Sequence, residues 1–236
     1  MLFNFWINFI VFIFSLFILQ PHLYIKFMHN YEEKINKNLF ALIKDIQKPN
    51  ILELGVQEGV STKKFLDLCE VNRGFLYSVD IVDCSNVSSS KRWKFIKSSD
   101  DNFSYIKSQI TEQIDILFID TLHEAKHVKN LFYNYYDLVK EGGFIFIDDI
   151  SHLPYLNTEK KSHFYCEINN RETFNSLLEI YFFNYNNFSL NFSFESSGLA
   201  IIKKKNKEKL TKSKKLISNE FSIKNFIRKI WLNLKN

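Results

Sequence analysis

Five short apolar runs constrain the fold of this 236-residue chain more than any other feature. The runs are ILEL (51–54), FLYSV (75–79), WKFI (93–96), ILFI (116–119) and FIFI (144–147). Each is shorter than a typical helix and is apolar without alternation, as expected for strands that are buried on both faces. Helical segments separate the runs, so we predict an α/β fold with a mostly parallel sheet and helices on both faces.

The predicted helices have their apolar residues on one side. Residues 30–48 are one such segment, and residues 63–69 are also predicted to be helical. Between the last two strands, one helical face carries Val128, Leu131, Phe132, Tyr135, Leu138 and Val139. We expect Gly142 and Gly143 to end this helix, because glycine is common just past a helix C-terminus.

The pattern changes after the fifth strand. A helix at 173–184 precedes two strand-like runs, NFSLNFSFE and GLAIIKK, which are joined by ESSG. This order predicts an antiparallel hairpin that closes one edge of the sheet. The expected architecture is therefore a doubly wound, mostly parallel sheet with an antiparallel C-terminal hairpin.

The chain begins with a hydrophobic segment. Residues 2–19 carry no charge, and as a helix they would span about 27 Å, close to the thickness of a bilayer core. Lys26 and Lys34 follow this segment, so the positive-inside rule predicts a membrane anchor with a cytoplasmic-facing domain. The alternative is that translation starts at Met28 and the protein is cytoplasmic. We divide the chain into the N-terminal segment 1–27, a core domain 28–203 and a C-terminal extension 204–236.

The C-terminal extension is basic. Residues 203–215 read KKKNKEKLTKSKK, and the stretch 220–236 follows with helical periodicity. One face of that helix would carry Ile223, Phe226, Ile227, Ile230, Trp231 and Leu234. A basic helix with an apolar face is typical of membrane interfaces, although the same face could pack on the core or on a second subunit.

Composition limits the partners. The chain is 46% hydrophobic, which is enough for a sizeable core, and its net charge is +5. The basic residues concentrate outside the core and accompany no aromatic reading motif, which argues against a nucleic-acid partner. The three cysteines, Cys69, Cys84 and Cys166, form neither a disulfide framework nor a metal-binding pattern. No feature indicates the oligomeric state.

The stretch ILELGVQEGVST follows the first strand and opens a helix. Gly55 and Gly59 would let the backbone turn tightly and approach a ligand closely. Glu53 precedes this loop, and Asp80 ends the second strand, where an acid can accept hydrogen bonds from a ribose. The loop matches neither G-x-G-x-x-G nor a phosphate loop, which weakens a dinucleotide or nucleoside-triphosphate interpretation.

The pattern E-x-G-x-x-x-G-x-S followed by a strand-end Asp resembles motifs I and II of class I S-adenosylmethionine-dependent methyltransferases, over about residues 48–203. The resemblance implies a Rossmann-like fold with S-adenosylmethionine as cofactor. It also implies roles for individual residues. The Gly55–Gly59 loop and Ser61 would line the methionine portion, Glu53 would support the loop, Asp80 would bind the ribose, and Ser99 or Asp100 would lie near the adenine.

Three acids end the fourth and fifth strands: Asp120, Asp148 and Asp149. In an open parallel sheet, ligands bind at the carboxyl ends of the strands, beside the predicted cofactor loop. Three converging carboxylates would repel one another without a cation, and oxygen ligands suit Mg²⁺. A bound Mg²⁺ could lower the pKa of an acceptor hydroxyl.

This acid set is similar to the metal site of catechol-type and macrocin-type O-methyltransferases, which implies Asp120, Asp148 and Asp149 as ligands. His123 lies close behind the first ligand, where catechol-type enzymes keep a lysine base, and a neutral imidazole is a reasonable base. His127 is an alternative ligand, and His152 is a candidate for substrate contact.

The sequence therefore predicts a metal-assisted O-methyltransferase that acts on a hydroxyl of a small molecule or of a sugar or glycoconjugate. Two alternatives remain. One is a methyltransferase-like fold with other chemistry, similar to cephalosporin hydroxylase-type proteins, and the other is a non-catalytic membrane-associated binding module. The intact Gly55, Gly59, Asp80 and acid set argue against the second.

Overall fold

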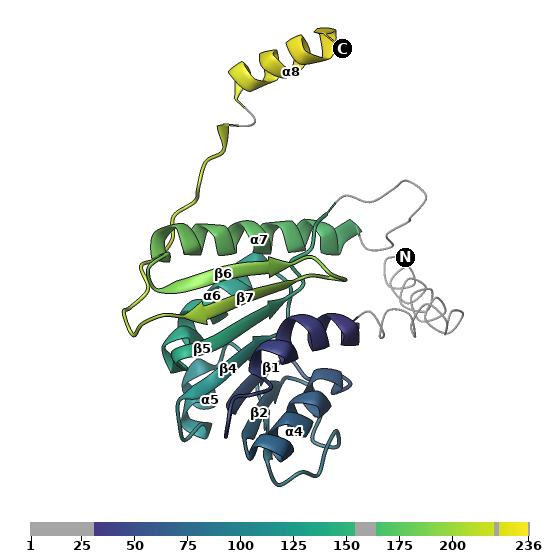
Figure 1. Cartoon of the computed structure of the whole chain (residues 1–236), viewed down its shortest axis with the longest axis vertical. Helices are drawn as coiled ribbons and strands as arrows, with labels where there is room; N and C mark the ends of the chain where they lie inside the picture. The colour runs from purple at the N-terminus through teal and green to yellow at the C-terminus, as the bar shows by residue number, and fades with distance from the viewer. Residues whose placement is uncertain (1–30, 154–163, 220–221, 236) are drawn as a thin grey trace, which may run out of the picture.

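The computed structural model describes residues 31–153, 164–219 and 222–235, so the hydrophobic segment 2–19 lies outside the described residues (Figure 1). The described part contains a seven-stranded sheet in the order β3-β2-β1-β4-β5-β7-β6. The strands are β1 (Asn50–Leu54), β2 (Phe75–Asp80), β3 (Trp93–Lys97), β4 (Ile114–Ile119), β5 (Val139–Asp148), β6 (Phe188–Ser193) and β7 (Leu199–Lys204).

The first five strands are parallel, and β7 pairs antiparallel with both β5 and β6. Three of the connections between successive parallel strands run through α4 (Val60–Asn72), α5 (Phe103–Gln109) and α6 (Ala125–Tyr135), whereas β2 and β3 are joined by a loop. This topology confirms the predicted Rossmann-like, doubly wound sheet with its antiparallel C-terminal hairpin. The strand order reverses at β1 and β4, so their carboxyl ends form the edge where such sheets bind ligands.

Helices cover both faces of the sheet. On one face, α4 and the helical run 31–43, which includes η1 (Asn36–Phe40) and α3 (Ala41–Ile43), pack on β1, β4 and β5. On the other face lie α5, α6 and the long helix α7 (Phe164–Asn184), which crosses the hairpin side of the molecule (Figure 1). Two apolar clusters, one on each face, hold these layers together. The inner strands β1, β2 and β4 are therefore buried on both sides, which explains their continuous apolar sequences, whereas the edge strands β3 and β6 are only partly buried.

Gly142 and Gly143 do not end a helix, and that prediction was wrong. The helix α6 already ends at Tyr135, a short 3-10 turn η2 (Tyr136–Leu138) follows, and both glycines lie inside β5. A Cβ at Gly143 would lie 2.8 Å from the Asp115 carbonyl oxygen, so glycine allows β5 to approach β4 closely where their register shifts. Glycine inside a strand commonly marks such an irregularity.

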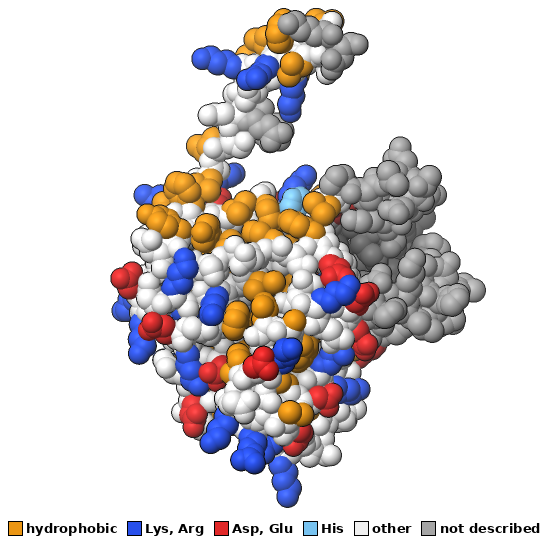
Figure 2. Space-filling model, in the orientation of Figure 1, with side chains coloured by type: hydrophobic (Ala, Val, Ile, Leu, Met, Phe, Trp, Pro, Cys, Tyr) orange, Lys and Arg blue, Asp and Glu red, His pale blue; other side chains and the backbone are white. Residues whose placement is uncertain are grey.

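The C-terminal helix α8 (Ile223–Lys235) stands away from the rest of the molecule at the end of an extended segment (Figure 1). Its apolar side chains are exposed: Ile223, Phe226, Ile227, Ile230, Trp231, Leu232 and Leu234. Figure 2 shows these hydrophobic side chains beside basic ones on the same helix. Within the described ranges, none of the helices has the length and apolarity to cross a bilayer.

Candidate active site

The loop between β1 and α4 is shaped by two glycines in left-handed backbone conformations. Gly55 has φ +96°, and a Cβ at this position would fall 1.8 Å from the carbonyl oxygen of Asp120. Gly59 has φ +76°, and a Cβ there would meet the Val87 side chain at 2.2 Å. Gly55 therefore satisfies two requirements, because the turn needs a positive φ and the backbone of Asp120 leaves no room for a side chain.

Glu53 is fully buried beneath this loop. Its carboxylate accepts hydrogen bonds from Ser61 Oγ at 2.6 Å, Thr62 Oγ1 at 2.7 Å and Ser78 Oγ at 2.7 Å. Desolvation by burial raises the pKa of Glu53 to about 7, although the three hydroxyl donors act in the opposite direction. Glu53 thus ties the start of α4 to β2, and its predicted role in supporting the cofactor loop stays a prediction. The buried hydroxyl of Ser61 points to Glu53, and its predicted contact with the cofactor stays a prediction.

Asp80, at the end of β2, braces the same loop. Its Oδ2 accepts hydrogen bonds from the backbone N–H groups of Val56 at 2.8 Å and Gln57 at 3.1 Å. Its Oδ1 accepts one from Val82 N at 2.8 Å. A carboxylate has about four acceptor positions, so the half-buried Asp80 keeps capacity for a ribose hydroxyl. The structure thus brings Asp80 against the glycine loop, while its contact with ribose stays a prediction.

Ser99 and Asp100 follow β3 at the same end of the sheet, and both are half-buried. The Asp100 carboxylate meets His127 Nε2 at 2.9 Å and accepts a hydrogen bond from the Thr121 hydroxyl. Tyr135 donates to the Asp100 carbonyl oxygen at 2.7 Å. His127 therefore faces Asp100 rather than the three-acid cluster, which leaves no support for His127 as a metal ligand.

Asp120, Asp148 and Asp149 form the three-acid cluster at the ends of β4 and β5. Burial raises the pKa of Asp120 well above its ordinary value, and the charges of Asp148 and Asp149 raise it further. Burial followed by the charge of Asp148 likewise raises the pKa of Asp149. Asp148 is itself buried, and its charge acts on both Asp120 and Asp149, so the three carboxyl groups lie in one electrostatic environment.

The helical run 31–43 supplies two side chains to this cluster, Tyr31 and Lys34, which were not predicted to belong to the site. Lys34, interpreted from the sequence only as a flanking charge, is fully buried and makes a salt bridge with Asp148 Oδ1. Its Nζ also donates to Ser197 Oγ at 2.7 Å. Tyr31 donates to Asp120 Oδ2 at 2.9 Å. Helical spacing places Tyr31 and Lys34 on the same side as the buried Ile35, which is the signal that could have found them.

His123 lies at the open side of the cluster. Its Nε2 is 3.1 Å from Asp149 Oδ2 and 3.9 Å from Asp120 Oδ1, and its side chain is 36% exposed. The imidazole is thus oriented by a carboxylate and accessible to an acceptor. This is the arrangement that a general base requires.

The described side chains do not fit a divalent metal as they stand. Within the described ranges, no group of three His, Cys, Asp or Glu side chains is arranged to hold a metal ion. Each acid is instead engaged by a protein group: Asp148 by Lys34, Asp120 by Tyr31, and Asp149 by His123. Ligation of Mg²⁺ by the three acids stays a prediction that this arrangement does not support.

Two hollows lie outside this cluster. The smaller, of about 200 Å³, is lined by His152, Glu167, Ile168 and Arg171. His152 packs against Phe174, with ring centroids 4.8 Å apart, so the structure places it beside α7 rather than among the three acids. Its predicted contact with the substrate stays a prediction.

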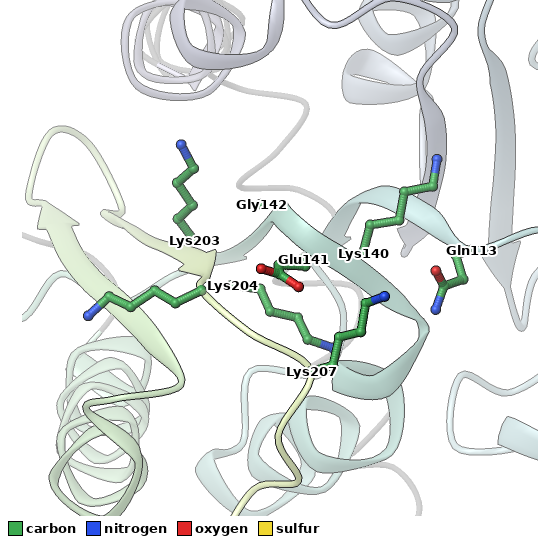
Figure 3. Close-up of a pocket in the computed structure, with 8 residues that line it drawn as sticks. Gln113, Lys140, Glu141, Gly142, Lys203, Lys204 and Lys207 are labelled. Atoms are coloured by element: carbon green, nitrogen blue, oxygen red, sulfur yellow. The ribbon is translucent and has the colours of Figure 1, made fainter.

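The larger hollow, of about 680 Å³, lies at the opposite end of β5 and is rich in lysine (Figure 3). Its ammonium groups point in different directions (Figure 3). Two of its lysines are held by neighbouring groups. Lys204 Nζ donates to the carbonyl oxygens of Tyr136 at 3.0 Å and Val139 at 2.9 Å, and Lys140 pairs with Asp115 at 2.9 Å. This hollow is therefore not a candidate for the methyl-transfer site.

Comparison with known families identifies the class. Residues 52–150 match the family model described as a methyltransferase domain. This range contains most of β1, all of β2 to β5, the glycine loop and the three acids. The chain thus carries a class I S-adenosylmethionine-dependent methyltransferase domain. No curated protein matches the chain in sequence.

Solved structures share the fold at low identity. MycE, a methyltransferase from the mycinamycin biosynthetic pathway solved with Mg and SAH, superposes with a TM-score of 0.55 at 20% identity, covering 72% of this chain. This chain spans about half of that protein, since 48% of MycE is covered. A candidate caffeoyl-CoA O-methyltransferase from Staphylococcus aureus has a TM-score of 0.54 at 16% identity, with coverages of 72% and 81%. The SAH-bound Podospora anserina methyltransferase PaMTH1 has a TM-score of 0.57 at 13% identity, with coverages of 76% and 88%.

Proposed function

We propose that the protein transfers a methyl group from S-adenosylmethionine to a hydroxyl of a small molecule or of a sugar or glycoconjugate. One observation carries this proposal: Gly55 of the cofactor loop lies against the backbone of Asp120, which begins the three-acid cluster. The methyl donor and the His123–Asp149 pair would therefore share one continuous edge of the sheet. The neighbours described as a mycinamycin-pathway methyltransferase and a candidate caffeoyl-CoA O-methyltransferase support this acceptor class.

Each group of residues has its own role in the proposed methyl transfer. S-adenosylmethionine, when bound, would supply an electrophilic methyl group for the acceptor oxygen, with its sulfur as the leaving group. The glycine loop, held by Glu53 and Asp80, positions the donor. His123 takes the proton that the acceptor hydroxyl loses, and Asp149 orients the imidazole and stabilises its charged form.

The first test is cofactor binding. Titration calorimetry should detect S-adenosylmethionine binding to the wild-type protein, and the Asp80→Ala variant should bind more weakly because an acceptor for the ribose is removed. If the wild-type protein binds no S-adenosylmethionine, the proposal fails. The loss in Asp80→Ala also includes the loosened glycine loop, so far-UV circular dichroism of that variant is the required control.

The second test concerns the acceptor. Mass spectrometry of small-molecule and glycoconjugate extracts incubated with the protein and S-adenosylmethionine should show products heavier by one methyl group. Their fragmentation should place that group on oxygen. Methylation on nitrogen or carbon would contradict the proposed acceptor class, whereas cofactor binding without turnover on any extract would favour the binding-module alternative.

A further inference from the structure

The strongest observation outside the predicted chemistry is the position of Lys34. Its side chain is fully buried, and its ammonium forms a salt bridge with Asp148 and donates to Ser197 Oγ at 2.7 Å. The same ammonium lies 4.7 Å from the ring centroid of Tyr31. A buried ammonium is costly unless it is paired and hydrogen-bonded, so these contacts make up a built site.

Three distant segments form this site. Lys34 comes from the helical run 31–43, Asp148 ends β5, and Ser197 lies in the turn between β6 and β7. Lys34 and Asp148 are 114 residues apart in sequence. The Asp148 Oδ1 atom that meets Lys34 also accepts a hydrogen bond from Asp149 N at 2.8 Å. The salt bridge therefore connects directly to the backbone of the residue that orients His123.

From this geometry we propose that Lys34 is a built-in substitute for a divalent cation, so that the three-acid cluster works without a bound metal. The ammonium offsets the carboxylate charge that otherwise calls for Mg²⁺, and it occupies one of the two Asp148 oxygens that a metal could use. A divalent ion placed among the same acids would lie close to the ammonium and be repelled by it. This inference rests on the proposed function in one respect: the proposed function places the three-acid cluster in the active site.

Lys34 then acts as a positioning residue. By holding Asp148, it leaves Asp149 as the carboxylate that faces His123 at 3.1 Å. Loss of the ammonium would leave Asp148 as a buried acid without a positive partner beside Asp120 and Asp149, with room for a cation where the ammonium was. Removal of Lys34 should therefore convert the cluster into a metal site.

Titration of the full chain with MgCl₂ and MnCl₂, followed by calorimetry and thermal unfolding, tests this idea without reference to activity. The wild-type protein should show no saturable binding. The Lys34→Met variant should bind both ions at least about tenfold more tightly, and its midpoint of unfolding should rise with the ion concentration. The Lys34→Arg variant keeps the charge and should behave like the wild type.

Lys204→Met is the matched control. Lys204 is also buried, but carbonyl oxygens rather than carboxylates receive its ammonium, so its loss should lower stability without creating cation binding. Saturable Mg²⁺ binding by the wild-type protein would overturn the proposal, as would a folded Lys34→Met variant that gains no binding. If Lys34→Met does not fold, the wild-type titration alone decides. A protein that binds no S-adenosylmethionine refutes the proposed function and leaves this test unaffected.

Discussion

Gly55 lies against the main-chain carbonyl of Asp120, so closely that a Cβ on Gly55 would fall 1.8 Å from the carbonyl oxygen. This contact joins the cofactor loop after β1 to the acid that follows β4. The two strands are hydrogen-bonded neighbours in parallel register, and Asp120 N donates to Leu54 O at 2.9 Å. The loop and the acid therefore cannot move independently.

A substitution of Gly55 tests that contact. We expect Gly55→Ala to lose S-adenosylmethionine binding and several kcal/mol of stability, since a left-handed residue costs about 1–2 kcal/mol and overpacking adds about 1–3 kcal/mol. Gly142→Ala is the matched control, because Gly142 also has a positive φ but a Cβ there meets nothing within 4 Å. Denaturant unfolding should show the larger loss for Gly55→Ala, and equal losses in the two variants would refute the close approach.

The pKa of Glu53 gives a prediction for stability against pH. The pKa of about 7 in the folded state lies above the ordinary value of 4.5, so the folded state binds the proton more tightly than the unfolded state. The stabilisation from this proton is complete below the ordinary pKa and is lost as pH rises through 7. Glu53→Gln cannot titrate, so its stability relative to wild type should improve by about 3 kcal/mol between pH 4 and 8. A difference that does not vary with pH would contradict the buried, shifted carboxyl.

His123 provides the prediction for catalysis. His123→Gln should lower the rate of methyl transfer by about 10²–10⁴-fold, because general-base catalysis contributes about that factor. Binding of S-adenosylmethionine should stay unchanged, since the imidazole contacts Asp149 rather than the glycine loop. His152→Gln is a useful comparison because His152 packs beside Phe174 away from the acids, and we expect it to affect KM more than kcat. Full activity of the His123→Gln variant would show that His123 is not the general base.

The C-terminal helix provides a prediction for membrane binding. Exposed Phe226, Ile227 and Trp231 lie on a helix that also carries Lys224 and Arg228, and the run 203–215 adds further lysines. This combination complements an anionic lipid surface, where each basic residue near the surface contributes about 1 kcal/mol. The protein starting at Met28 should therefore sediment with anionic liposomes at low salt and not with neutral ones.

A double variant and a truncation distinguish membrane binding from packing of the C-terminal helix on the core or on a second subunit. Phe226→Ser with Trp231→Ser should abolish sedimentation with liposomes without changing the midpoint of thermal unfolding. If the wild-type protein stays in the supernatant and removal of residues 204–236 lowers that midpoint, the extension is a packing element of the core or of a second subunit.

The sequence predicted the sheet well because the inner parallel strands β1, β2 and β4 are buried on both faces, and each therefore appears as an apolar run in the sequence. It failed at Gly142 and Gly143, where glycines fit a helix end and a strand irregularity equally well. The periodicity of apolar residues also did not predict α5, and it predicted that α7 begins at residue 173 rather than at Phe164. A helix that is short, or that has apolar and polar residues mixed on all sides, shows little periodicity in its sequence.

The site was predictable where its residues belong to one strand and the following turn. Glu53, Gly55, Gly59 and Asp80 lie within a β-α-β unit, and the structure assembles them around one loop. The partner of Asp148 was not predictable in this way. Helical spacing indicates that Lys34 lies on the buried side of the helical run 31–43, but no local signal encodes its contact with Asp148, which is 114 residues away in sequence.

Asp149 has a φ of +59°, outside the extended region that β5 occupies. Neighbouring residues of a regular strand point to opposite faces, so two successive aspartates could not ordinarily serve one site. The left-handed turn at Asp149 brings its carboxylate to the same side as that of Asp148. Asparagine or glycine could keep this backbone but not the charge, whereas valine or isoleucine would be strained there. Whether by evolution or by design, a substitution at position 149 therefore keeps this backbone only if the new residue tolerates a left-handed conformation.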